Sequence, residues 1–377
     1  MRKEPLLNVR RVVCLAALLS LLSAGTAVAA PASDAPEVDT VAVGGTPGAV
    51  AVSPDGGQVF VTVDDRDEQG GPVTLVKVVD AGTGDIDATV PLPRSGTSGA
   101  GRVTFSPDGT LAYALSGQSV TVIDTDTDTV LRSFTVPDQP RPSGRSPGPL
   151  KSVAVSPDGA SLYVGQDGPT GGNPWEGRGR LLVFASATGT LTGSTALTGP
   201  RVADVLVRPD GKDGYVSTEA GGLLHLDLTT ASPTVLRRIY QPGGEGGANG
   251  AALTADGGKL YYLVTRYNWV REVSTADDGP HGTLSSTPVV PMYTDARSPM
   301  LSHDGSRFYV VDNDPKGPTV GAMDTATHKV LGPVAGVKAT DVRGAAVSAD
   351  DSTLYLAGST GAAGGGILQF LPAPQAR

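Results

Sequence analysis

Apolar and polar residues alternate along much of the chain, in short runs separated by turns. Val50–Val52, Val103–Phe105 and Val153–Val155 are three such runs, and each is followed directly by Ser-Pro-Asp-Gly. A period of two places successive side chains on opposite faces of a strand. In the tetrad, proline presets φ, aspartate bonds back to the backbone and glycine takes the left-handed position. Each run with its tetrad therefore predicts a strand that enters a β-hairpin.

The turn recurs through the whole chain at intervals of 46 to 53 residues. Its copies stand at Ser53–Gly56, Ser106–Gly109, Ser156–Gly159, Arg208–Gly211, Thr254–Gly257, Ser302–Gly305 and Ser348–Asp351. Third strands with a second kind of turn after them are expected at Thr74–Asp80, Val120–Asp124, Leu181–Ala185, Leu223–Asp227, Val320–Asp324 and Ile367–Phe370. Four strands in about 50 residues, repeated seven times, predict an all-β fold, a seven-bladed β-propeller with four antiparallel strands per blade.

The two ends of the repeat region predict how the ring closes. The seventh repeat ends at Phe370 after its third strand, and an additional strand-like run, Val38–Val43, precedes the first turn. An N-terminal strand that completes the last blade would remove two exposed sheet edges. We therefore expect Val38–Val43 to pair into the seventh blade.

Two segments carry a resemblance to a known family. Val153–Val164 (VAVSPDGASLYV) and Val120–Val130 (VTVIDTDTDTV) resemble the YVTN-type propeller repeat of secreted bacterial and surface-layer proteins. The resemblance covers essentially the whole chain after its N-terminal segment, and its motif residues are structural. It therefore implies the fold and says almost nothing about chemistry.

The N-terminal segment has the pattern of an export signal. Arg2, Lys3, Arg10 and Arg11 precede an apolar run, Val12–Ala24, which Ala27-Val28-Ala29 follows. A mostly apolar run of thirteen residues is too short to span a bilayer. We expect residues 1–29 to be a signal peptide cleaved after Ala29, and 30–377 to be one domain, secreted and without a membrane span.

Composition narrows the class further. Glycine (51) and proline (30) make up about a fifth of the 377 residues, which excludes a helical bundle or coiled coil. The net charge of −9 becomes −12 without the four basic residues and one acidic residue of 1–29, and this argues against nucleic acid as a partner. Because Cys14 lies in the signal, the mature chain lacks disulfides, a thiolate metal site and a thiol nucleophile.

A candidate binding site comes from aligning the seven first strands on their turns. The residues four or five positions before each turn are Gly48, Arg102, Lys151, Asp204, Asn249, Arg297 and Arg343. Four of these are cations, and Arg141, Arg145, Arg178, Arg180 and Arg201 add positive charge nearby. Cations that converge on a channel mouth would attract an anion. The alternative is that each one pairs with a neighbouring carboxylate or faces solvent.

Long connections provide two aromatic candidates and an acidic one. Trp175 and Trp269 fall in connections at 166–180 and 265–282, where they either stack on a ligand or hold their own loops in place. A cation candidate is formed by Asp64, Asp65, Asp67 and Glu68 together with Asp312, Asn313 and Asp314, although solvated acidic loops are the commoner interpretation.

Two function classes remain open. In the first, the protein is a monomeric binding module for a glycan, an envelope protein or a small anionic ligand, without metal or cofactor. In the second it is a hydrolase or lyase similar to the lactonase propellers, which are expected to present an Arg-His pair before the first strand. No such pair occurs, and the histidines at 225, 281, 303 and 328 show no ligand or triad spacing. The sequence therefore favours binding, with no catalytic residue assigned.

Overall fold

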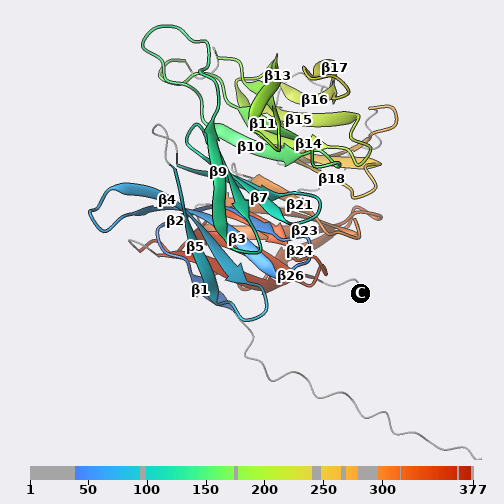
Figure 1. Cartoon of the computed structure of the whole chain (residues 1–377). Coiled ribbons are helices and arrows are strands. Elements are labelled where there is room, and N and C mark those ends of the chain that lie inside the picture. The colour runs from blue at the N-terminus through green and yellow to red at the C-terminus, as the bar shows by residue number, and fades with distance from the viewer. Residues whose placement is uncertain are drawn as a thin grey trace, which may run out of the picture. The chain divides into compact units, whose positions relative to one another are not determined.

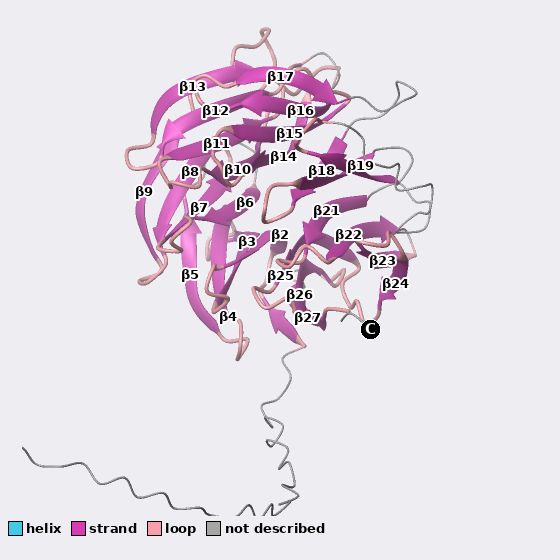
Figure 2. Cartoon of the chain, turned by 90° about the vertical axis from the view of Figure 1, so that its right-hand side faces the viewer, coloured by secondary structure: helices cyan, strands magenta, loops and turns pink. Residues whose placement is uncertain are grey.

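The computed structural model describes residues 39–93, 99–173, 177–239, 248–264, 269–278, 296–314, 316–362 and 365–374. The predicted signal peptide lies outside these residues. Val38–Arg377 form one compact unit, and every regular element described in it is a strand (Figure 2). Within the described residues, no helix has the length and apolar character needed to cross a membrane.

Blades one to four are four-stranded antiparallel sheets. Their strands are β2 (Thr46–Val52), β3 (Gln58–Arg66), β4 (Pro72–Asp80) and β5 (Ile86–Leu92); β6 (Ala100–Phe105), β7 (Leu111–Ser116), β8 (Ser119–Asp124) and β9 (Thr129–Thr135); β10 (Leu150–Val155), β11 (Ser161–Gln166), β12 (Arg180–Ala185) and β13 (Thr190–Ala196); and β14 (Arg201–Val207), β15 (Asp213–Glu219), β16 (Gly222–Asp227) and β17 (Thr234–Ile239).

Blades five to seven complete the set. Their strands are β18 (Ala248–Leu253), β19 (Lys259–Val264) and β20 (Trp269–Ser274); β21 (Ala296–Leu301), β22 (Arg307–Asp314), β23 (Gly317–Asp324) and β24 (Val330–Val334); and β25 (Asp341–Val347), β26 (Thr353–Ser359) and β27 (Gly366–Pro372), with β1 (Thr40–Ala42). In blade five, the stretch that follows β20, 279–295, lies outside the described residues.

The first strands of the blades form a closed ring. In order around it, β2 contacts β6, and then β10, β14, β18, β21 and β25 follow, with β25 in contact with β2 again. Figure 2 shows these strands toward the centre, while β5, β9, β13 and β17 lie on the outside; Figure 1 gives the order by colour. The protein is therefore a seven-bladed β-propeller, as the repeat predicts.

The ring closes through the N-terminal strand. Strand β1 pairs antiparallel with β27, with Thr40 opposite Gln369 and Ala42 opposite Ile367. The amide of Val43 donates to the carbonyl of Gly366 at 3.0 Å and extends this pairing. The sheet order β1-β27-β26-β25 places β1 where other blades have their own fourth strand, so the predicted closure is confirmed.

The repeated tetrads form the predicted turns. In six blades their glycine has a φ between 69° and 78°, and in the seventh Asp351 has 61°. Because every blade is an antiparallel meander, these turns and the turns after each third strand lie at one end of the blades, which we call the turn face. The remaining connections lie at the other end, the loop face. The central channel, lined by the first strands, runs between the two faces.

Between the blades, each second strand contributes an aromatic side chain to the core. These residues are at most 4% exposed and are Phe60, Tyr113, Tyr163, Tyr215, Tyr261, Tyr309 and Tyr355. They belong to apolar clusters that join neighbouring blades; Tyr113 of blade two, for example, packs with Leu162 and Phe184 of blade three. The blades are thus a rigid scaffold for both ends of the channel.

Candidate functional site

Every first strand has a β-bulge near the loop face. In β10, for example, Leu150 pairs with Gln166 and Ser152 with Gly165, so that Lys151 has no partner opposite it. The bulged positions are Gly48 and Ala49, Gly101 and Arg102, Lys151, Ala203, Asn249 and Gly250, Ser298 and Pro299, and Arg343. A bulge bends the strand and redirects a side chain, here at the rim of the channel.

These bulges border a cavity of about 410 Å³ at the loop-face end of the channel. Three cationic residues line it, Arg102, Lys151 and Arg343, from blades two, three and seven. The other residues at the wall are small or apolar and include Gly48, Ala49, Gly101, Ala203, Ser298, Pro299 and Gly344. The structure therefore brings together three of the predicted cations. We call this cavity the channel mouth.

Arg102 also links blades that are not neighbours. Its Nη2 bonds to Oδ1 of Asp204, which lies on β14 beyond the first strand of blade three. The other oxygen of Asp204 accepts the Ala251 amide at 3.0 Å, and the side chain of Asp204 is only 5% exposed. Asp204 therefore holds a guanidinium whose side chain is still 45% exposed.

The other two cations are differently placed. Arg343 bonds through Nε to Asp341 at 2.7 Å, and both side chains are exposed. Lys151 is exposed, and no described carboxylate lies within ion-pair distance of it. Of the alternative weighed from the sequence, pairing with a carboxylate thus applies to Arg102 and Arg343, and exposure to solvent applies to Lys151.

A buried carboxylate lies behind Lys151. Asp167 is 7% exposed, and its Oδ1 accepts the Val202 amide at 2.7 Å. Burial raises the pKa of Asp167 to about 6, although this hydrogen bond and the charges of Lys151 and Arg201 favour the ionised form. The charge of Asp167 therefore changes near pH 6, behind the residues that line the mouth.

Two further candidates lie in the walls between blades. The side-chain amide of Asn249 donates to the Ala296 carbonyl at 2.8 Å and joins blade five to blade six. Arg297 pairs with Val311 in β21, and Ser298 and Pro299 are the residues of this strand at the mouth. The role of both residues in ligand binding stays a prediction.

The roles expected of the two tryptophans stay predictions. Trp175 lies outside the described residues. Trp269 opens β20 and pairs with Val264, so the expected connection at 265–282 contains a strand that the sequence analysis missed. The turn after β20, at 274–278 (STADD), is similar in sequence to the turn after β23, at 324–328 (DTATH). This similarity could have predicted a third strand before it.

The acidic loops bond to backbone groups, of the next blade for Asp64 and Asn313 and of the same loop for Asp67. Asp64 accepts the Ala100 amide at 2.9 Å, and Asp67 accepts the amide of Gly71. Asn313 exchanges two hydrogen bonds with the backbone of Val342. Across the described ranges, no three His, Cys, Asp or Glu side chains are arranged to hold a metal ion.

Each described histidine bonds to a carboxylate of an adjacent blade. His225 Nδ1 lies 2.6 Å from Asp278, His328 Nε2 lies 3.1 Å from Glu272, and His303 Nδ1 lies 3.0 Å from Asp351. The sequence did not predict these links, which are on the turn face. They give the histidines a role in joining blades.

Known proteins add no further assignment. No protein-family model matches the chain, and no curated protein matches it. The fold and the site therefore define the class, a seven-bladed β-propeller with a cation-lined mouth at one end of its channel.

Proposed function

We propose that the protein is a secreted binding module that holds an anionic group, a carboxylate or a phosphate, in the channel mouth. The observation that carries this proposal is the convergence of Arg102, Lys151 and Arg343 on one cavity with otherwise small walls. Charged donors held in fixed positions make short, strong hydrogen bonds to carboxylate or phosphate oxygens.

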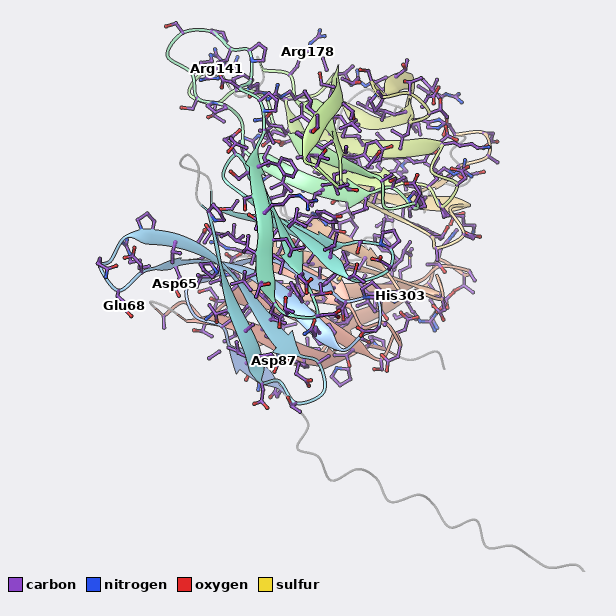
Figure 3. All side chains as sticks on the ribbon, viewed as in Figure 1. Asp65, Glu68, Asp87, Arg141, Arg178 and His303 are labelled. Atoms are coloured by element: carbon purple, nitrogen blue, oxygen red, sulfur yellow. The ribbon has the colours of Figure 1, made fainter. Side chains whose placement is uncertain are left out.

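The surroundings of the mouth support an anionic ligand. Arg141 and Arg178 project from two connections on the loop face, and Figure 3 shows both at the upper edge of the molecule. Arg178 is exposed, whereas Arg141 bonds to Asp138. A concave site bordered by cations attracts anions even when the whole protein is acidic.

Export and family belong to the same proposal. The charged and apolar pattern of residues 1–29 supports a cleaved signal peptide and a secreted protein. The Tyr-containing second strands and Pro-Asp-Gly turns support membership of the YVTN-type repeat class. An anionic envelope glycan would be a ligand in keeping with both.

Calorimetric titration of mature protein with a galacturonate trimer, a neutral galactose trimer and inorganic phosphate tests the proposal. At least one anion should bind, more weakly as salt rises, and the neutral sugar should not. The double variant Lys151→Ala/Arg343→Ala should weaken binding tenfold or more, because each lost charged hydrogen bond is worth more than about 1.4 kcal/mol.

The matched control is Arg141→Ala/Arg178→Ala, which removes the same charge from the same face outside the cavity. Equal weakening by both double variants would place binding on the loops instead of the mouth. Hydrolysis of lactone or ester probes that disappears in Lys151→Ala/Arg343→Ala would assign catalysis to the mouth and replace the binding proposal.

A further inference from the structure

The turn-face end of the channel is lined by one large apolar side chain from every blade. Each is the last residue before the turn, and the seven are Val52, Phe105, Val155, Val207, Leu253, Leu301 and Val347. They border a cavity of about 630 Å³, larger than the channel mouth, and its inner wall includes the Arg102–Asp204 pair. All but Val347 are partly exposed. We call this cavity the apolar end.

The side chains of the apolar end are held in place by the core. Its side chains also pack into the clusters between blades, as Val155 does against the cluster that contains Tyr113 and Leu162. Phe105 makes an edge-to-face contact with Phe60, with ring centroids 4.9 Å apart. A cavity whose walls are fixed by the core needs little reorganisation to accept an apolar group.

The turns form the rim of the apolar end. The second residue of each turn is Pro54, Pro107, Pro157, Pro209, Ala255, His303 and Ala349, and three of these, Pro107, Ala255 and His303, line the cavity. Figure 3 shows His303 on the side of the molecule opposite Asp65 and Arg141 of the loop face. The two ends of the channel thus open on opposite faces with different linings.

A ring of carboxylates surrounds the apolar end. Three residues after each apolar side chain, within about 10 Å along the chain, stand Asp55, Asp108, Asp158, Asp210, Asp256, Asp304 and Asp350. The hydroxyl of Ser53 and the amide of Gly57 hold the pKa of Asp55 below its usual value, and the same kind of turn hydrogen bond lowers the pKa of the others. These carboxylates therefore stay ionised in mildly acidic solution.

Most cations nearby bond to other carboxylates. Arg307 pairs with Asp324 and Lys259 with Glu272. Among the described residues, Asp210 is the turn aspartate with an ion pair, at 3.6 Å from Arg208. Arg208 and Lys212 near Asp210, Lys259 near Asp256 and Arg307 near Asp304 offset part of the charge of the ring. The turn aspartates of blades one, two, three and seven have no ion pair among the described residues and are available to a partner.

We propose that the apolar end is a second binding site, for a segment of a partner protein in which one leucine or phenylalanine is flanked by lysine or arginine. The apolar lining takes the central side chain, and the aspartate ring attracts the flanking cations. The same ring repels anionic segments. This site opens on the opposite face from the channel mouth and selects the opposite charge, although Arg102 and Pro299 line both cavities.

The test uses mature protein and three fluorescently labelled peptides, four lysines around a central leucine, four lysines around a central serine, and four glutamates around a central leucine. The lysine–leucine peptide should bind one to one and weaken as salt rises. The serine peptide should bind at least tenfold more weakly, and the glutamate peptide should not bind. Equal binding of the leucine and serine peptides would overturn the proposal, because nothing would then enter the cavity.

Variants and a crosslink locate the binding. Asp55→Asn/Asp304→Asn/Asp350→Asn keeps oxygen acceptors in the turns and should weaken binding tenfold or more. The matched control Asp65→Asn/Asp67→Asn/Glu68→Gln removes three charges from the loop face and should leave binding unchanged, as should Lys151→Ala/Arg343→Ala.

A photoreactive leucine in the peptide should crosslink to Phe105, Val155 or Leu301. Because the crosslink uses the unchanged protein, it tests the site even if a variant fails to fold. Crosslinks confined to the loop face, or equal weakening by the two triple variants, would contradict the proposal. Loss of anion binding at the mouth without loss of peptide binding would separate the two sites.

Discussion

The two ends of the channel are built from the same seven strands and differ because the repeat is kept at one end and broken at the other. At the turn face, every strand ends in an apolar residue and a turn aspartate. At the loop face the strands are bulged, and the bulged positions range from glycine to arginine. The repeat therefore specifies the fold and a uniform turn-face end, whereas its departures give the loop-face end a mixed set of side chains.

The largest effect on stability should come from removing β1, because both ends of the channel need a closed ring. Deleting residues 36–44 removes β1 and leaves β27 as an unpaired edge beside the first blade. We expect the melting temperature to fall by about 10 °C or more, with both cavities lost together. Scanning calorimetry measures this, with deletion of 30–35 as the control. A mutant that melts like the wild type would show that the ring holds without β1.

The next largest effect on stability should come from breaking the ion pair between Arg102 and Asp204 at the mouth. Arg102→Ala leaves the nearly buried Asp204 without its cation, and breaking such a pair from one side costs roughly 3 kcal/mol. In Arg102→Ala/Asp204→Asn the uncompensated charge is gone, while the amide oxygen still accepts the Ala251 amide. Urea unfolding should therefore show that the double variant is more stable than Arg102→Ala. If the two are equally stable, the pair does not hold the blades.

The two faces should also differ in their response to pH. The pKa of Asp167 is raised to about 6, so its contribution to stability is fully present below pH 4 and is lost as the pH rises through 6. Near pH 8, Asp167→Asn should be more stable than the wild type by up to about 3 kcal/mol. The difference should vanish near pH 4, and urea unfolding at both pH values measures it.

The turn aspartates provide the opposite case. Their pKa values are lowered, so their contribution is present above the ordinary value and is lost as the pH falls below it. A variant such as Asp304→Asn should therefore lose stability at neutral pH, and the loss should shrink as the pH falls through the lowered pKa of Asp304. For Asp167, a stability difference between Asp167→Asn and the wild type that is the same at pH 4 and at pH 8 would contradict the raised pKa.

The sequence predicts the fold well because the turns are local. A Pro-Asp-Gly turn needs no distant contact, and its bonds, such as the Gly56 amide to the Ser53 carbonyl at 2.8 Å, lie within four residues. The closure by β1 could also be predicted from the sequence. The last repeat lacks a fourth strand, and the N-terminal side of the first repeat has an additional one, which pairs with β27.

The channel mouth is harder to predict, because bulges shift the register. Arg102 and Asp204 lie four residues before their turns, whereas Lys151 and Arg343 lie five residues before theirs. One inserted residue in a strand decides which side chain faces the channel. The link from Arg102 to Asp204 spans 102 residues and has no local signal.

Strand β20 was missed for a different physical reason. Its sequence, WVREVS, contains Arg271 and Glu272, which are both 5% exposed. Glu272 accepts a hydrogen bond from Tyr261 at 2.7 Å and pairs with Lys259. Charged residues that are buried with partners break the apolar alternation by which strands are recognised.

The smallest effect that we expect is a change in ligand affinity at the channel mouth when Asp341 is replaced. Asp341 neutralises part of the charge of Arg343, but both side chains are exposed, so the pair should contribute less than about 1 kcal/mol to folding. Asp341→Asn should therefore leave the melting temperature nearly unchanged and strengthen binding of a galacturonate trimer a few-fold, because more of the positive charge faces the mouth. The control Asp87→Asn removes the same charge from β5, on the outside of blade one, where Figure 3 shows it far from Arg141. Tighter binding in both variants would mean that net charge, and not the mouth, sets the affinity.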